Sequence, residues 1–367
     1  MAIEVIAPGI LTSVQDGGRY GFEQYGVSPS GPMDAHSFRI ANILAGNDPD
    51  EAALEMTVMG AELKFTAPGV IALAGADMGA AVNGQKVPMY QAVSLRAGDV
   101  LKMGFAAAGC RTYLAVHGGI DVPSVMGSRA TMIGKKFGGF EGRRLEKGDV
   151  REVRGGAESL PHQETYFTQA ETVSAGTRTL RVILGPQEDR FTEEGIRTFL
   201  GSEYTVGQDF DRQGYRLEGP KIAHTTDSNI ISDGIVTGSV QVPGTGLPIV
   251  MTAERATVGG YTKIATVITA DMPLIGQCKA GDRIRFREVT PEEAQDLLQA
   301  EAEQLESLRS QVQDPSHVPP VKAAAAPAAG VPAQAPAAAE HEYEYTKDVT
   351  ISINGKAYEV TIQKWKE

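Results

Sequence analysis

Short apolar runs, separated by residues that favour turns, make up most of the first 290 residues of the chain. Typical runs are Val70–Ala74, Thr112–Val116 and Leu180–Leu184, and glycine or proline occurs close to each of them. Runs of this length bounded by turn residues are typical of strands rather than of buried helices. The 42 glycines agree with many tight turns, since an average chain of 367 residues has about 26. The pattern predicts a mainly β fold.

Few segments have helical spacing. Asp34–Leu44 carries an apolar face behind Asp34, a residue suited to cap a helix N-terminus, and Thr192–Leu200 is followed by Gly201, which favours a helix end. Residues 291–312 are charged, with alanine and leucine at helical spacing and a proline in the first turn. We expect helices at these three places, the last of them amphipathic.

A Gly-Asp pair occurs three times between a turn that contains a basic residue and an apolar run. The three stretches are Leu95–Leu101, Leu145–Val150 and Cys278–Ile284. This pattern predicts a tight turn with positive φ at the glycine, followed by a strand that completes a barrel or sheet.

Two longer stretches, Gln15–Gly21 and Asp209–Arg216, also resemble each other, since each combines aspartate, arginine, glycine and an aromatic residue. We therefore expect two related β-barrel-like domains, at residues 1–155 and 175–290. Turn chemistry alone can also produce a repeated Gly-Asp pair, so that alternative stays open at this point.

The chain changes character after residue 312. Residues 313–341 form an alanine and proline tract that cannot bury enough apolar surface to order itself, which predicts a semi-extended linker. Residues 342–367 regain the alternation of a strand, and Asn354-Gly355 between two alternating runs is a strong hairpin signal. An isolated hairpin is only marginally stable in water, so we expect this one to dock on something.

Charge and cysteine content exclude several classes of function. A formal net charge of −12 disfavours nucleic acid and anionic membranes as main partners. The first 18 residues lack the pattern of a signal peptide, and no window approaches 18 uninterrupted apolar residues. Cys110 and Cys278 lie far apart and fit neither a disulfide framework nor a Cys-x-x-Cys metal site. A reduced, cytoplasmic compartment is the expectation.

Familiar catalytic motifs are absent from the sequence. The stretch Gly127–Lys136 fails as a phosphate-binding loop, because six residues separate its glycines and no serine or threonine follows the lysine. The six histidines show no metal-ligand spacing, so we expect no metal site. His117-Gly118-Gly119 resembles the start of an oxyanion loop, but no Gly-x-Ser-x-Gly elbow accompanies it. A turn histidine bonded to backbone is the plainer interpretation.

Polar side chains instead gather in glycine-rich loops. Glycine lets a ligand approach the backbone closely, arginine offers forked donors to carboxylate or urea-like oxygens, and loop amides can form oxyanion holes. For any single residue, bracing of a turn is an equally good interpretation. These loops contain Asp16, Arg19, Ser28, Ser30, Asp34, Ser128, Arg129, Asp211, Arg212, Tyr215, Gln241, Thr257, Gly259, Gly260 and Tyr261.

The loops also form an ordered series of motifs across about residues 3–290. The series includes Asp16-Gly17-Gly18-Arg19, Gly26-Val27-Ser28, Gly31-Pro32-Met33-Asp34, Gly127-Ser128-Arg129, Gly185-Pro186-Gln187, Asp211-Arg212-x-Gly214-Tyr215, Gly238-Ser239-Val240-Gln241-Val242-Pro243 and Thr257-Val258-Gly259-Gly260-Tyr261. In this order they resemble the KipA family, also known as the C component of 5-oxoprolinase, as allophanate hydrolase subunit 2 and as the second half of the urea carboxylase carboxyltransferase domain. Ala130 and Glu254 depart from the residues common in that family.

The resemblance implies two cyclophilin-like β-barrel domains and an obligate KipI-like partner, with the active site near the shared surface. It implies carboxyl transfer from carboxybiotin to a small amide or urea-like substrate. One alternative is the C component of an ATP-dependent 5-oxoprolinase, which opens a lactam. Another is a regulatory binding partner of a KipI-like kinase inhibitor. We predict catalytic roles for Arg19, Asp34, Arg129, Asp211, Arg212 and Tyr215, and substrate or biotin contacts for Ser28, Ser128, Gln241, Thr257, Gly259, Gly260 and Tyr261.

The C-terminal hairpin resembles the segment that opens biotin-carrier polypeptides, but no Ala-Met-Lys-Met follows it. We therefore expect that a separate carrier delivers carboxybiotin and that biotin is not attached to this chain. The expected partners are a KipI-like protein with either biotin carboxylase and carrier proteins or a lactamase-like protein. ATP would serve the complex, because no nucleotide motif is present here. A truncated fusion without a present role is the alternative for the tail.

Overall fold

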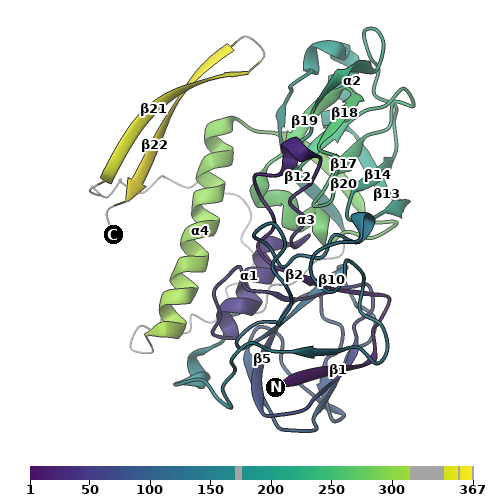
Figure 1. The fold of residues 1–367 in the computed structure, drawn as a ribbon. Coiled ribbons are helices and arrows are strands. Elements are labelled where there is room, and N and C mark those ends of the chain that lie inside the picture. Colours follow the sequence, from purple (N-terminus) through teal and green to yellow (C-terminus); the bar gives the residue numbers. More distant parts are fainter. Residues whose placement is uncertain (170–175, 315–342, 354–355, 366–367) are drawn as a thin grey trace. The chain divides into compact units, whose positions relative to one another are not determined.

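The computed structural model describes residues 1–169, 176–314, 343–353 and 356–365. The chain divides into two compact units, Met1–Val318 and Pro319–Glu367. The larger unit contains two β-rich halves, drawn in purple to teal and in teal to green in Figure 1. The predicted mainly β class is confirmed.

The first half is built from two sheets. Their strand orders are β11-β1-β4-β9-β6-β7 and β2-β3-β10-β5-β8. The strands are β1 (Ala2–Ala7), β2 (Leu11–Gln15), β3 (Ala53–Thr57), β4 (Glu62–Phe65), β5 (Gly69–Gly75), β6 (Ala81–Val82), β7 (Gln85–Lys86), β8 (Ala92–Leu95), β9 (Val100–Lys102), β10 (Arg111–Val116) and β11 (Val150–Glu152).

The second half is a closed barrel with strand order β12-β19-β16-β17-β14-β13-β20. Its closing pair, β12 with β20, is parallel. Two further strands, β15 (Asn229–Gly234) and β18 (Val258–Tyr261), pair with each other as a ribbon outside the barrel sheet. The barrel strands are β12 (Thr177–Leu184), β13 (Glu203–Phe210), β14 (Gly214–Glu218), β16 (Ser239–Gln241), β17 (Ile249–Met251), β19 (Lys263–Val267) and β20 (Arg283–Glu288).

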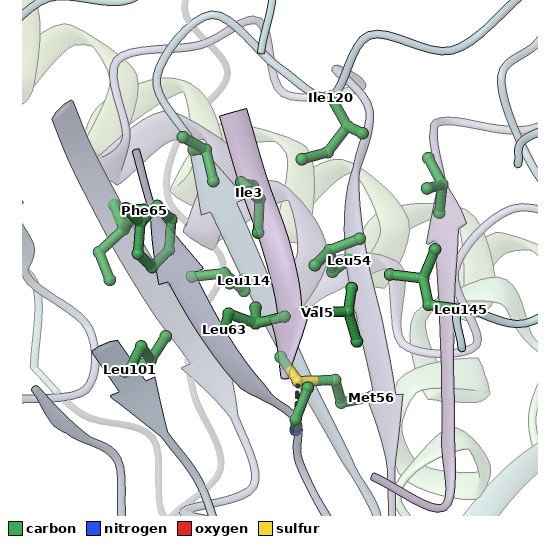
Figure 2. Packing of buried hydrophobic residues seen from close by; sticks show 14 of the residues in the cluster. Ile3, Val5, Leu54, Met56, Leu63, Phe65, Leu101, Leu114, Ile120 and Leu145 are labelled. Atoms are coloured by element: carbon green, nitrogen blue, oxygen red, sulfur yellow. Dashed lines mark hydrogen bonds between the residues drawn. The ribbon is translucent and has the colours of Figure 1, made fainter. Parts of the chain in front are cut away.

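Each half has its own apolar core. In the first, residues that alternate along the strands meet between the two sheets, as Figure 2 shows for Val5, Leu54, Leu63 and Leu114. In the second, the core fills the barrel and includes Tyr215. Both halves belong to one compact unit, so the predicted division into domains at residues 1–155 and 175–290 stays a prediction.

The three predicted Gly-Asp turns have one common geometry. Gly98, Gly148 and Gly281 have φ values of 88°, 89° and 88°, so the expectation of positive φ is confirmed at each. A strand, β9, β11 or β20, follows every one of them. In each turn the aspartate side chain accepts a hydrogen bond from the backbone N–H three residues before it. The halves therefore use the same turn to enter a strand.

All three predicted helices are present. They are α1 (Ala35–Leu44), which Asp34 caps by accepting from Ser37 N, α2 (Glu193–Gly201) and α4 (Pro291–Gln313). A short helix, α3 (Met272–Gly276), was not predicted. Among the described residues, no helix is both long and apolar enough to cross a membrane.

Helix α4 lies beside α1 (Figure 1). It begins just after the last barrel strand, where Thr290 and Glu293 form a capping box. Its Leu305, Leu308 and Val312 pack into an apolar cluster that also contains α1 residues of the first half. The helix therefore ties the end of the barrel to the first half.

The smaller unit contains β21 (Tyr343–Ile353) and β22 (Lys356–Trp365), which pair as an antiparallel hairpin. The predicted C-terminal hairpin is confirmed. Residues 315–341 of the expected linker lie outside the described residues.

Candidate functional site

A groove of about 1040 Å³ lies on the outer face of the barrel. Tyr215 and Leu217 on β14 point into the core, so the alternate residues Gly214 and Arg216 point outward and line the groove. The other lining residues are Gly207, Gln208, Asp209, Phe210, Asp211, Gln213, Leu217, Glu218, Gln241, Pro243, Thr245, Leu247, Pro248, Ile249, Met251 and Tyr261. This groove brings together three residues predicted from the sequence, namely Asp211, Gln241 and Tyr261.

Gln241, on β16, is the most distinctive of these three. Its side chain is nearly buried, yet its amide Nε2 has no hydrogen-bond acceptor among the described residues. A buried amide donor without a partner costs free energy that native proteins seldom leave uncompensated. Gly259 makes room for it, because a Cβ atom at position 259 would lie 2.9 Å from Nε2. The predicted glycine thus has a steric role beside the predicted glutamine.

Asp211 and Tyr261 have different roles in the groove wall. The Asp211 carboxylate accepts hydrogen bonds from the N–H groups of Gln213 (2.7 Å) and Gly214 (3.1 Å), so it shapes the turn between β13 and β14. Tyr261 ends β18 and is 43% exposed, which leaves its ring open to a ligand. The ribbon therefore contributes an aromatic side chain to the groove.

A buried lysine lies next to Gln241. Lys263, on β19, is the register partner of Gln241 across the β16–β19 pair, and it is only 2% exposed. Its ammonium donates to Asp233 Oδ2 of the ribbon strand β15 at 2.9 Å, and Gln187 Nε2 donates to the same oxygen at 3.2 Å. The hydrogen bond from Lys263 lowers the pKa of Asp233 below its ordinary value.

Arg212 lies elsewhere, at the junction between the two halves. Its guanidinium pairs with Glu55 of the first half and, at 2.6 Å, with Glu254. It also donates to the carbonyl of Gly31 at 2.5 Å. All of its nitrogens therefore have partners, and the side chain is buried.

Asp34 and Tyr215 belong to the same junction. Asp34 Oδ2 accepts from Gln277 Nε2 at 2.8 Å, and burial raises the pKa of Asp34 above its ordinary value. The Tyr215 hydroxyl accepts from Arg111 Nη1 at 2.6 Å and donates to the Cys278 carbonyl at 3.2 Å. Burial likewise raises the pKa of Tyr215. This junction network joins the halves through buried side chains that are hydrogen-bonded to one another.

Arg19 and Ser128 meet in the first half, in a loop that Asp16 organises. Arg19 donates to the carbonyls of Val125 (2.8 Å) and Ala130 (3.0 Å), and burial lowers its pKa. Asp16 accepts from Ser128 Oγ at 2.6 Å and from the N–H of Arg129. Arg19 thereby fastens the loop that contains the predicted Ser128 and Arg129.

The remaining predicted residues are more scattered. Ser28 is fully buried with an unpartnered Oγ among the described residues, and Thr257 is nearly buried. Gly260 lies beside Gly259 on β18. The predicted set thus falls into three places, namely the groove, the junction network and the Arg19 loop, and the assignment of catalytic roles within it stays a prediction.

Sequence reasoning missed Lys263 and Glu55. Lys263 follows the Gly-Gly-Tyr motif by two positions, but it begins a barrel strand whereas Tyr261 ends the separate ribbon, so no local pattern marked it. Glu55 lies within a short apolar strand, in the Leu54-Glu55-x-Thr57 motif that belongs to the same family resemblance, but no local pattern marks it as the partner of Arg212. In the part of the chain that the structure describes, no group of three or more histidine, cysteine, aspartate or glutamate residues could hold a metal ion.

Comparison with known proteins connects this architecture to one family. The family model described as "Carboxyltransferase domain, subdomain A and B" matches residues 25–288. The C component of 5-oxoprolinase from Escherichia coli is 37% identical over 292 residues, which cover 80% of this chain and 93% of that protein. The urea amidolyase of Saccharomyces cerevisiae is 34% identical over 84% of this chain, but the chain spans only 18% of that longer protein.

Solved structures agree. The crystal structure of the Kluyveromyces lactis urea carboxylase matches with a TM-score of 0.78 and 33% identity, covering 84% of this chain and 29% of that chain. Most of the chain therefore has the fold of one region within that larger enzyme.

Proposed function

The chain belongs to the carboxyltransferase family matched over residues 25–288, and from this membership we propose that it is the component in which carboxybiotin and a small amide or urea-like acceptor meet. The groove on the outer face of the barrel is the proposed meeting place. Its volume of about 1040 Å³ is at the upper end of the usual range for small-molecule sites.

The observation that supports this proposal is the unpartnered amide of Gln241 beside the groove. Amides, ureas and the ureido ring of biotin all carry a carbonyl oxygen that accepts hydrogen bonds, so the donor fits this class of ligand. Tyr261 offers an aromatic face next to it. Carboxybiotin, when bound, supplies the carboxyl group.

The chain itself then binds and orients. Gln241 would donate to the carbonyl oxygen of the ligand, and Gly207 and Gly214 contribute backbone without a side chain to the groove wall. Alignment of two reactants and electrostatic stabilisation of a developing oxyanion lower a barrier without a covalent protein intermediate. The structure identifies no general base, and Asp211 is a candidate because of its place in the groove.

The proposal includes partners that this chain does not contain. A separate carrier would deliver carboxybiotin, a KipI-like protein would complete the site, and ATP would be used by another component. The C-terminal hairpin would dock within that assembly. We place the complex in the cytoplasm, since Cys110 and Cys278 are both buried and unlinked, as in proteins from reducing compartments.

The test is a carboxyl-transfer assay with the complex co-purified from its native host. Urea, 5-oxoproline and related amides are supplied with ATP and labelled bicarbonate, and label in the acceptor is measured. We expect label from bicarbonate to appear in one of the acceptors. For Gln241→Leu, kcat/KM for that acceptor should fall about tenfold. Gln299→Leu, on the exposed face of α4, is the matched control. No transfer to any acceptor would contradict the proposal.

A second candidate is the opening of the 5-oxoproline lactam by an ATP-dependent complex. This chain matches 93% of the C component of 5-oxoprolinase from Escherichia coli, so nearly the whole of that relative is represented here. The match therefore favours this second function. The same assay separates the two functions. Release of glutamate without labelled product supports lactam opening, whereas labelled product supports carboxyl transfer.

A further inference from the structure

The turn between β13 and β14 connects the groove to the junction network. Asp211, Gln213 and Gly214 of this turn line the groove in the second half. Arg212, in the middle of the same turn, instead has its side chain buried at the junction with the first half. Consecutive Cα atoms are held about 3.8 Å apart, so the turn cannot shift at Arg212 without moving its neighbours in the groove wall.

The first half holds both terminal nitrogens of Arg212. Nη1 pairs with the Glu55 carboxylate, and Nη2 donates to the Gly31 carbonyl at 2.5 Å. The third nitrogen, Nε, donates to Glu254 of the second half at 2.6 Å. A guanidinium is a planar group with donors in fixed directions, so acceptors at all three nitrogens define both its position and its orientation. Glu55 therefore helps to determine where the turn lies.

Glu55 is itself held in one place, because its second oxygen also has partners. Oε2 accepts from the Tyr113 hydroxyl and from the Met33 N–H, each at 2.8 Å. Glu55 and Tyr113 are register partners on β3 and β10, so their side chains lie on the same face of the sheet. The Tyr113 hydroxyl accepts in turn from the Asp34 N–H at 2.8 Å. These groups are buried, so water does not compete for their hydrogen bonds.

The turn is also bonded to a second segment of the groove wall. The Arg212 carbonyl accepts from Thr252 Oγ1 at 2.8 Å and from the Glu254 N–H at 2.6 Å. The Gln213 carbonyl accepts from the Thr252 N–H at 3.0 Å. These residues follow Met251, which ends β17 and lines the groove. A displacement of Arg212 therefore reaches the groove through two segments.

We propose that Glu55 is a positioning residue for the groove. Through Arg212 its carboxylate fixes the turn between β13 and β14 and the end of β17, and the Tyr113 hydroxyl keeps that carboxylate in place. The shape of a ligand site in the second half then depends on a carboxylate of the first half. The inference goes beyond the proposed function, which assigns nothing to Glu55, and it rests on the groove being the site.

The first test compares two tyrosine variants in the complex. Tyr113→Phe removes the hydroxyl that holds Glu55 but keeps the pair between Glu55 and Arg212. Tyr90→Phe is the matched control, since it removes another buried hydroxyl of the first half, one that accepts from the Gly75 N–H at 3.0 Å. We expect Tyr113→Phe to raise the KM for the acceptor at least about threefold and Tyr90→Phe to leave it unchanged.

The KM separates positioning from support of the fold. A loss of folded protein lowers the apparent kcat and leaves KM as it was, so urea denaturation of both variants accompanies the kinetics. An unchanged KM for Tyr113→Phe, or an equal rise for Tyr90→Phe, would overturn the proposal. Glu55→Gln should have a larger effect, about tenfold in KM, because it removes the charge that pairs with Arg212. If that variant folds poorly, Tyr113→Phe still decides the matter.

Hydrogen exchange on the full chain tests the same contacts without any reaction. The Gln213 and Gly214 N–H groups report on the turn, and the Glu254 N–H reports on the segment after β17. Tyr113→Phe should raise their exchange rates at least about threefold, and Tyr90→Phe should not. Unchanged rates in both segments would reject the positioning role even in an active complex. Faster exchange in a complex without carboxyl transfer or lactam opening would support the fixed geometry and reject the proposed function.

Discussion

The junction network and the groove contain similar residue types but differ in how fully those residues are paired. At the junction, Arg212 reaches Glu55 and Glu254, and the Tyr215 hydroxyl both accepts and donates a hydrogen bond. Beside the groove, the Gln241 amide has no acceptor among the described residues. A saturated polar network rigidifies a structure, whereas an unpaired donor at a concave surface is ready for a ligand. We therefore expect Arg212 and Tyr215 to hold the halves together and Gln241 to bind.

The largest effect should follow from breaking the junction. Arg212→Met leaves Glu254 buried without its cation and Glu55 with the more distant Arg111, which should lower the free energy of unfolding by about 3–5 kcal/mol. Urea denaturation measures it. Arg283→Met, which removes an exposed cation near Glu203, is the control and should cost less than about 1 kcal/mol. A loss of activity with unchanged stability would instead make Arg212 part of the catalytic machinery.

The junction should also depend on pH through Glu55. Burial alone would raise the pKa of Glu55, but Arg212, Arg111 and hydrogen bonds outweigh burial and lower it. A carboxyl whose folded pKa is depressed contributes stability above its unfolded pKa, about 4.3, and loses that contribution as the pH falls through the folded pKa.

The measurable consequence is a difference between two proteins. The free energy of unfolding of the wild type should exceed that of Glu55→Gln by about 2–4 kcal/mol near neutral pH, and this difference should shrink as the pH falls below about 4. Subtracting the variant removes the opposite contribution of Asp34, whose pKa is raised. A difference that stays constant down to about pH 3 would show that Glu55 is not the titrating group.

In the groove we expect the opposite result, namely weaker binding with little change in stability. Gln241→Leu removes a donor without a partner, so the free energy of unfolding should change by less than about 1 kcal/mol. The KM for the acceptor should rise about tenfold. Kinetics and denaturation on the same preparation check both parts. A destabilised variant with an unchanged KM would show that Gln241 has a structural role and does not bind the acceptor.

The smallest effect should come from Gly259→Ala. The added Cβ would lie 2.7 Å from Ile235 Cδ1 and 2.9 Å from Gln241 Nε2, and both are ends of side chains that can shift. Displacing the amide should raise the acceptor KM by about two- to fivefold. Gly260→Ala is the matched neighbour, since its nearest atom would be 3.4 Å away. Equal effects at both glycines would argue against a specific contact with Gln241.

Local signals predicted much of the fold, because helix caps, Gly-Asp turns and alternating strands depend on nearby residues. Asp34 caps α1 as expected, and Gly98, Gly148 and Gly281 have the expected positive φ. Strand order and the parallel pairing of β12 with β20 depend on contacts between distant residues, and no local pattern specifies them.

The candidate site was harder to predict for the same reason. From residue type, the sequence predicted both Arg212 and Gln241 as site residues. Their surroundings, however, depend on residues far along the chain. Glu55 pairs with Arg212 across 157 positions, and Lys263 reaches Asp233 on a separate sheet. The resemblance indicated which loops to consider, but whether a polar group in a loop is paired becomes visible only in three dimensions.

The parallel pair that closes the barrel has a consequence for synthesis. Thr177 on β12 is the register partner of Arg283 on β20. The closing pair therefore joins the first and the last strand of the barrel in chain order. Contacts at such sequence separation form slowly, and domains emerge from the ribosome in N-terminal order. The first half can therefore fold while the barrel is still an open chain, and the last barrel strand to be translated is the one that closes it.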